Sequence, residues 1–153
     1  MIEIIHTVVK VLLACAIIVL CFWLFKHHGR ASIESNDKSM DALNFPEGGY
    51  GFTATNTYKS GDFVAYRISS DANLHIARVI GVEGNRVQVT SKDVLVNGAP
   101  LGVQIQTRAW TIPETKVPRG CAYILADDPS GTDSKQFGPV PYASIAGTVK
   151  PAR

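Results

Sequence analysis

The sequence has little cysteine, no cluster of metal-ligating residues and no run of basic side chains. Two of its three cysteines, Cys15 and Cys21, lie inside an apolar N-terminal segment, and Cys121 stands alone in the rest of the chain, so no disulfide is predicted there. No cysteine and histidine residues have the spacing of metal ligands, so we predict neither a metal nor a cofactor. Lysine and arginine are scattered and the net charge is only +2, which argues against nucleic acid as a partner.

The sequence does contain a long apolar run. Residues 11–25 carry no charged side chain, and extending the run back to Ile4 includes His6 and Lys10. A helix over residues 4–25 crosses about 30 Å of hydrocarbon at about 1.5 Å per residue. Because Lys26 and two histidines follow, rather than a small-x-small cleavage site, we predict a retained single-pass anchor in a lipid bilayer. Lys26 and Arg30 follow the segment and only Lys10 precedes it, so the positive-inside rule by itself places the C-terminal part in the cytoplasm.

The rest of the chain has the pattern of a mostly β domain. We assign residues 1–30 to the anchor and 31–153 to the domain, with 31–60 as linker and loops. Short strand-like runs follow, and no long amphipathic helix is predicted. The predicted strands are 63–68, 74–80, 86–90, 93–96, 103–107, 122–125 and 145–149, with a tight turn at Asn97-Gly98. In the second of these, Ile76 and Arg78 share one face, and His75 and Ala77 share the other.

Four stretches, in order and with matching spacing, resemble the signal peptidase I family. They are Ser39-Met40; Gly61-Asp62-Phe63-Val64; Ala77-Arg78-Val79-Ile80-Gly81 with the hairpin that ends at Asn97-Gly98; and residues 117–140, which include Asp133-Ser134-Lys135-Gln136-Phe137-Gly138-Pro139-Val140. The resemblance implies a membrane-anchored serine endopeptidase that removes leader peptides from exported or pilin-like proteins. It also implies a location in the inner (cytoplasmic) membrane with the domain on the non-cytoplasmic side, opposite to the side that the charge count indicates.

The resemblance implies Ser39 as nucleophile and a lysine general base immediately before Arg78, where this sequence has Ala77. An alanine side chain cannot accept a proton, so three interpretations stay open. The alanine is an engineered replacement in an active enzyme, or another base such as His75 serves, or the protein is a pseudo-peptidase that binds without cutting. His75 is two strand residues away, about 6.6 Å, and needs a bulge or shift to reach Ser39.

The position of the nucleophile has an alternative. Residues 44–50 match the Ser-x-Pro-x-Gly-x-Tyr spacing of the plasmid conjugation peptidases, a branch of the same family, with Asn44 in place of the serine. In that register both catalytic positions are vacant, and Ser39 is a linker residue. We favour Ser39.

The remaining implications concern support and substrate. Arg78, Asp127, Asp133 and Lys135 resemble the residues that support the active site, with an ion pair between Asp133 and Lys135. The substrate is expected to bind as an added β-strand between the segment before Ser39 and the region from Arg67 to Arg78. The pseudo-peptidase, which docks substrate or scaffolds a secretion or conjugation assembly, is the main alternative function. Self-cleavage, as in SOS-repressor relatives, is a weaker one.

Overall fold

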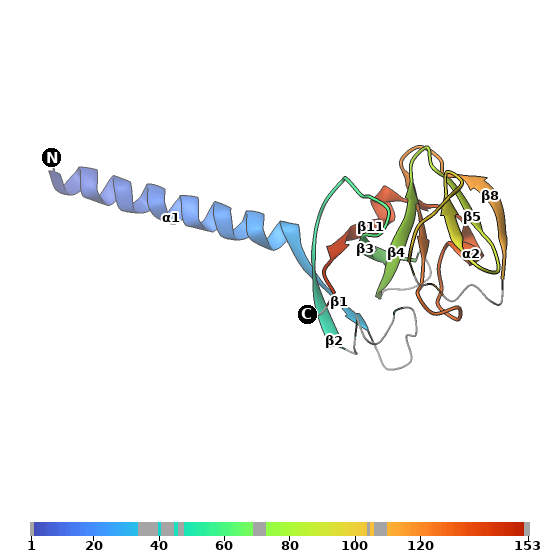
Figure 1. Cartoon of the computed structure of the whole chain (residues 1–153). Helices are drawn as coiled ribbons and strands as arrows, with labels where there is room; N and C mark the ends of the chain where they lie inside the picture. Colours follow the sequence, from blue (N-terminus) through green and yellow to red (C-terminus); the bar gives the residue numbers. More distant parts are fainter. Residues whose placement is uncertain are drawn as a thin grey trace.

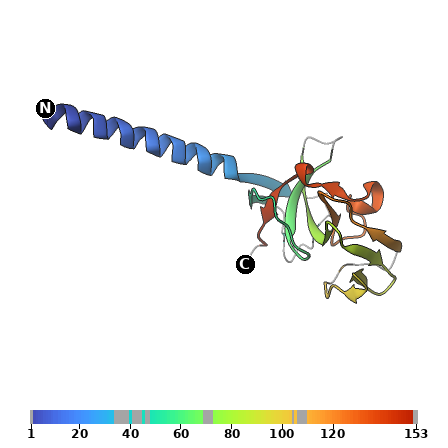
Figure 2. The same ribbon diagram turned by 90° about the horizontal axis from the view of Figure 1, so that it is seen from above.

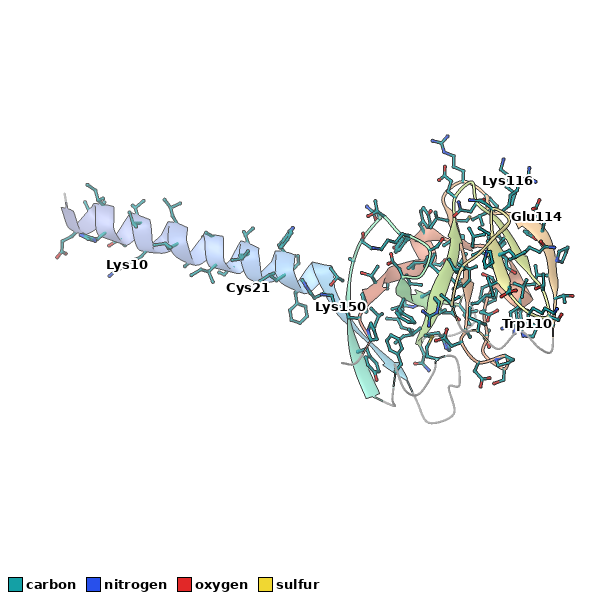
Figure 3. All side chains as sticks on the ribbon, viewed as in Figure 1. Lys10, Cys21, Trp110, Glu114, Lys116 and Lys150 are labelled. Carbon is teal, nitrogen blue, oxygen red and sulfur yellow. The ribbon has the colours of Figure 1, made fainter. Side chains whose placement is uncertain are left out.

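A long helix projects from a β-rich domain in the computed structural model (Figure 1). The structure describes residues 2–33, 40, 45, 48–68, 73–103, 105 and 110–151. Helix α1 (Ile2–His27) carries exposed apolar side chains on all its sides, as Figure 3 shows. Its segment Glu3–Phe25 is long and apolar enough to cross a membrane, and none of it is buried against the domain. The predicted anchor helix is therefore present, and its side chains are suited to lipid.

The larger sheet has seven strands in the order β1-β2-β11-β3-β4-β9-β10, and all neighbours are antiparallel. Its strands are β1 (His28–Ile33), β2 (Gly48–Thr53), β3 (Phe63–Arg67), β4 (Leu74–Val82), β9 (Cys121–Leu125), β10 (Val140–Pro141) and β11 (Ile145–Val149). The prediction of linker and loops over 31–60 is wrong at β1 and β2. Three of the six residues of β2 are glycine, so it has backbone pairing but no alternating side-chain pattern for a sequence analysis to detect.

A smaller sheet, in the order β7-β6-β5-β8, lies at the end of the domain away from α1 (Figure 2). Its strands are β5 (Arg86–Val89), β6 (Val94–Val96), β7 (Ala99–Pro100) and β8 (Ile112–Lys116). Asn97 and Gly98 have φ values of 53° and 81°, which confirms the predicted tight turn. The strand predicted at 103–107 is wrong at Val103 and Ile105, which belong to no strand, and the other three residues lie outside the described set. Gly102, with φ of 70°, interrupts extended backbone directly before that segment.

Strand β4 is buried on both faces at its centre. Ala77 and Val79 pack into a cluster with Val64 and Tyr66, whereas Ile76 points to the opposite face. The predicted alternation along β4 is therefore confirmed. The opposite face is covered by a second cluster, formed by Met40, Phe45, Ala65, Ile76 and Val149. A third cluster lies between the two sheets and includes Ile80, Val87 and Leu125.

Candidate active site

Ala77 and Arg78 point to opposite faces of β4 because they are consecutive strand residues. Ala77 is opposite Val64 in the β3–β4 ladder, is fully buried, and packs in the same cluster as Tyr66. A lysine at position 77 would direct its side chain into these apolar surroundings. Burial of that kind lowers the pKa of a lysine amine, since it disfavours the charged form. The surroundings of residue 77 are therefore those that a neutral lysine base requires.

Arg78 is held by a carboxylate and an aromatic ring. Its Nε donates to Asp127 Oδ1 at 2.9 Å and its Nη2 to Asp127 Oδ2 at 2.8 Å. The guanidinium carbon lies 4.2 Å from the centre of the Phe63 ring. Only 14% of the Arg78 side chain and 4% of the Asp127 side chain are exposed, so this forked pair, with its two parallel hydrogen bonds, is largely shielded from solvent. It ties β4, next to residue 77, to the loop that follows β9.

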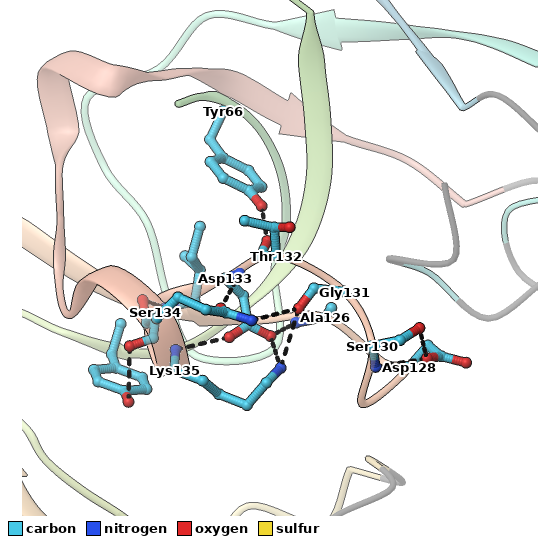
Figure 4. Close-up of polar contacts among 12 residues, drawn as sticks. Tyr66, Ala126, Asp128, Ser130, Gly131, Thr132, Asp133, Ser134 and Lys135 are labelled. Carbon is cyan, nitrogen blue, oxygen red and sulfur yellow. Dashed lines mark hydrogen bonds and ion pairs between the residues drawn. The ribbon is translucent and has the colours of Figure 1, made fainter. Parts of the chain in front are cut away.

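Asp133 is the buried centre of a second polar cluster, drawn in Figure 4. Its Oδ2 accepts from Ala126 N at 2.8 Å and also from Lys135 Nζ, and its Oδ1 accepts from Lys135 N at 2.8 Å. The side chain caps the short helix α2 (Ser134–Phe137), and Gln136 Oε1 accepts from Asp133 N in return. These donors satisfy a carboxylate that is fully buried. Burial and the Asp133 charge together raise the pKa of Tyr123 to about 12.

Tyr66 joins the loop that contains Thr132 and Asp133 to the face of the larger sheet that carries residue 77. Its hydroxyl donates to the carbonyl oxygen of Thr132, next to Asp133 (Figure 4). The alternation in the sequence predicts Tyr66 in a strand, but it gives no sign of this contact. The side chain of His75 shares the same face, and its ring centre lies 5.8 Å from that of Tyr66. A role for His75 as a base stays a prediction.

Both candidates for the nucleophile, Ser39 and Asn44, lie outside the described residues. Their neighbours Met40 and Phe45 are buried, and both pack on the Ile76 face of β4 rather than on the Ala77 face. The ring of Phe45 also contacts the ring of Phe63, with centres 4.7 Å apart. Met40 and Phe45, which adjoin the two candidates in the sequence, thus lie on the opposite side of the strand from residue 77.

On the β9 side of β4, the residues up to Ala77 have no partner strand in the described part of the chain. Residues Leu74 to Ala77 pair with β3, but the ladder with β9 on the other side begins only at Arg78. No described strand pairs with that edge between residues 74 and 77. Strand β1 pairs only with β2 and approaches β4. On this edge of β4, Leu74 and His75 are partly exposed, whereas Ile76 and Ala77 are fully buried, so an added strand would meet the first two residues directly.

The described part of the chain has a pocket and no metal site. It contains no group of three histidine, cysteine, aspartate or glutamate side chains that could hold a metal ion. A pocket of about 510 Å³ opens where β3 ends and β4 begins, with Tyr66, Leu74, Phe137 and Val140 among its lining residues. Neither Ala77 nor Arg78 lines it.

The structure thus joins an antiparallel β domain to a helix that is long and apolar enough to cross a membrane, with paired acids and bases beside a buried strand position. The family model "Signal peptidase, peptidase S26" matches residues 1–152, and the chain belongs to that family. Over 91 residues it is 31% identical to mitochondrial inner membrane protease subunit 1 of Xenopus tropicalis, which covers 58% of this chain and 46% of that protein. Over 89 residues it is 36% identical to mitochondrial ATP-independent inner membrane protease subunit 1a of Arabidopsis thaliana, covering 57% and 45%. The chain thus matches less than half the length of these relatives.

The fold is also that of a solved structure. A signal peptidase I from Enterococcus faecalis V583 superposes with a TM-score of 0.51 at 21% identity. The superposition covers 63% of this chain and 98% of the other. It confirms the predicted signal-peptidase-like β fold.

Proposed function

We propose that this protein is a membrane-anchored serine endopeptidase of the signal peptidase I type, in a form whose general base is replaced by Ala77. Its substrates are leader peptides of exported or pilin-like proteins, and its nucleophile is Ser39. The observation that carries the proposal is the fully buried strand position 77. It lies directly beside Arg78, whose guanidinium is fixed by Asp127, and on the same face as Tyr66, which holds the Asp133 loop.

The chemistry assigns one task to each group. A neutral lysine amine at position 77 would take the proton from the Ser39 hydroxyl while Ser39 Oγ attacks the scissile carbonyl carbon. The backbone N–H of Ser39 would donate to the oxyanion. When the C–N bond breaks, the proton passes to the leaving amine, and water then hydrolyses the acyl-enzyme ester. With alanine at 77 the site can hold a substrate, but it has no side chain there to move the proton.

The substrate would bind as an extended strand between the open edges of β1 and β4. Backbone hydrogen bonds to residues 74–77 would bring the scissile bond beside position 77. Met40, which adjoins the proposed nucleophile in the sequence, packs on the Ile76 face, whereas residue 77 faces the opposite side of β4.

The test is the substitution Ala77→Lys in the full chain. Base catalysis contributes about 10²- to 10⁴-fold, so cleavage of a leader-bearing polypeptide should rise by a factor of that order. Ala77→Met is the matched control, because it has a similar length and burial but no amine. Adding Ser39→Ala to the Ala77→Lys chain should abolish the gain. A folded Ala77→Lys protein that cleaves no faster than Ala77→Met would contradict the proposal.

The same assay tests His75. If His75 is the base, the unaltered chain already cleaves, at a rate that rises through the usual imidazole pKa of about 6.5. His75→Ala would then abolish cleavage.

A pseudo-peptidase is the second candidate function. It is favoured by the absence of a proton acceptor at position 77, where alanine packs with Val64 and Tyr66. Such a protein would bind leader-bearing chains along β4 without cutting them, in a secretion or conjugation assembly. Binding by the unaltered chain, together with no cleavage by Ala77→Lys, would favour this function over the enzyme.

A further inference from the structure

Trp110 makes a contact that joins the smaller sheet to the acid–base cluster of the site. The indole packs against the third core cluster, with Ile112 and other residues of the smaller sheet. The ammonium nitrogen of Lys135 lies 4.7 Å from the centre of its ring. Figure 3 shows Trp110 at the lower end of the domain, below the smaller sheet. The chain has two tryptophans, and the other one, Trp23, belongs to the apolar N-terminal helix.

Among the described residues, the indole is contacted through its ring face and not through its N–H. Trp110 Nε1 is buried and has no hydrogen-bond partner among the described residues. A buried indole N–H usually finds an acceptor, so this orientation of the ring needs another cause. The cation above the ring supplies one, because the negative face of the indole attracts an ammonium group. Lys135 has only 11% of its side chain exposed, which strengthens that attraction.

From Lys135 the contacts continue toward position 77. Its ammonium contacts Asp133 Oδ2, the same oxygen that accepts from Ala126 N. Ala126 directly precedes Asp127, whose carboxylate accepts two hydrogen bonds from Arg78. Each link is a direct contact or a covalent neighbour, so we expect the position of the Lys135 ammonium to affect the bond that Asp133 Oδ2 accepts from Ala126 N.

We propose that Trp110 is a positioning residue for the peptidase site. Its ring fixes the Lys135 ammonium on Asp133, and this couples the smaller sheet to the loop that orients Arg78. The catalytic consequence rests on the function proposed above, whereas the coupling from Trp110 to Ala126 does not.

The coupling is tested by the exchange rate of the Ala126 amide hydrogen, measured by NMR on the full chain in detergent micelles. Trp110→Leu and Trp110→Phe both remove volume and the N–H, but only phenylalanine keeps a ring face. Trp110→Leu should speed Ala126 exchange by about 2- to 30-fold, the range given by the strength of a cation–π contact. Trp110→Phe should restore most of the protection. The Val79 amide, which donates to Asp62 O at 2.7 Å in the larger sheet, is the control for global unfolding.

Unchanged Ala126 exchange in Trp110→Leu would overturn the proposal. An equal effect of the leucine and phenylalanine variants would overturn it as well. Lys135→Met should speed Ala126 exchange by itself. Adding Trp110→Leu to the Lys135→Met chain should then change the exchange rate little, and full additivity of the two effects would also refute the coupling. In the Ala77→Lys chain, Trp110→Leu should lower kcat and Trp110→Phe should not. If Ala77→Lys is inactive, the proposed function fails, while the exchange data still decide the coupling.

Discussion

The forked pair of Arg78 and Asp127 should contribute strongly to stability, and the substitution Asp127→Asn tests this. Asparagine keeps the shape and one acceptor oxygen but loses the charge that faces a guanidinium with only 14% of its side chain exposed. A hydrogen bond to a charged group contributes about 1.5–3 kcal/mol, and breaking a buried pair costs about 3–5 kcal/mol. Because one neutral bond can remain and the Phe63 ring still covers the cation, we expect a loss of about 2–3 kcal/mol.

The assay is urea unfolding of the full chain in micelles, followed by the far-ultraviolet β signal. Urea is preferred to guanidinium chloride because a salt would screen the interaction being measured. The pair Arg86–Glu114 is a matched control, since its side chains are 62% and 46% exposed. Glu114→Gln should therefore cost about 1 kcal/mol or less.

A double substitution isolates the interaction between Arg78 and Asp127 from the other contacts of each residue. Arg78→Met keeps an unbranched apolar side chain beside Phe63, and Asp127→Leu fills the space of the carboxylate. Replacing a buried ion pair by apolar residues is often neutral or stabilising, so the double variant should be more stable than either single variant. If Asp127→Asn costs no more than Glu114→Gln, the reasoning from burial is refuted. Additive effects of Arg78→Met and Asp127→Leu would refute the direct coupling.

Two further predictions concern pH and the membrane. Tyr123 has a pKa raised to about 12 from an ordinary value of 10.0, so its contribution to stability is complete below pH 10 and is lost as the pH rises toward 12. Each pKa unit corresponds to about 1.4 kcal/mol. In unfolding measurements from pH 8 to 12, Tyr123→Phe should lose less unfolding free energy than the unaltered chain. An equal slope of unfolding free energy against pH in the two proteins would contradict this prediction. The domain should face the non-cytoplasmic side of the inner membrane, so protease added to cells with a permeabilised outer barrier should digest it. Digestion only after lysis would favour the orientation that Lys26 and Arg30 indicate.

The sequence predicts the parts of the site that local patterns encode. Alternation along residues 74–80 assigns Ile76 and Ala77 to opposite faces, and the structure confirms both. Asn97-Gly98 predicts its turn because few residues tolerate positive φ. The ion pair of Asp133 and Lys135 is implied only by the family resemblance, and the structure adds that the Asp133 side chain caps the helix that contains Lys135. In the first two cases a short segment carries its own physical constraint.

What the sequence does not predict depends on contacts between distant segments. The glycines of β2 leave no side-chain pattern, and the strand exists because its backbone pairs with β1 and β11. Tyr66 reaches Thr132 across 66 residues of sequence. The contact between Trp110 and Lys135 likewise joins a core residue of the smaller sheet to helix α2. None of these pairs has a spacing or a residue type that marks it in a single sequence.

Alanine at position 77 is compatible with all the polar contacts around it. Burial on both faces of β4 comes from the whole sheet rather than from residue 77, and a lysine base as proposed needs such burial. Arg78, Asp127, Asp133 and Lys135 are held by hydrogen bonds that do not include residue 77. An alanine there leaves these contacts in place, because it closes the apolar cluster without an unpaired polar group. For the same reason, a single Ala77→Lys substitution is the appropriate test, since the supporting residues are already arranged around it.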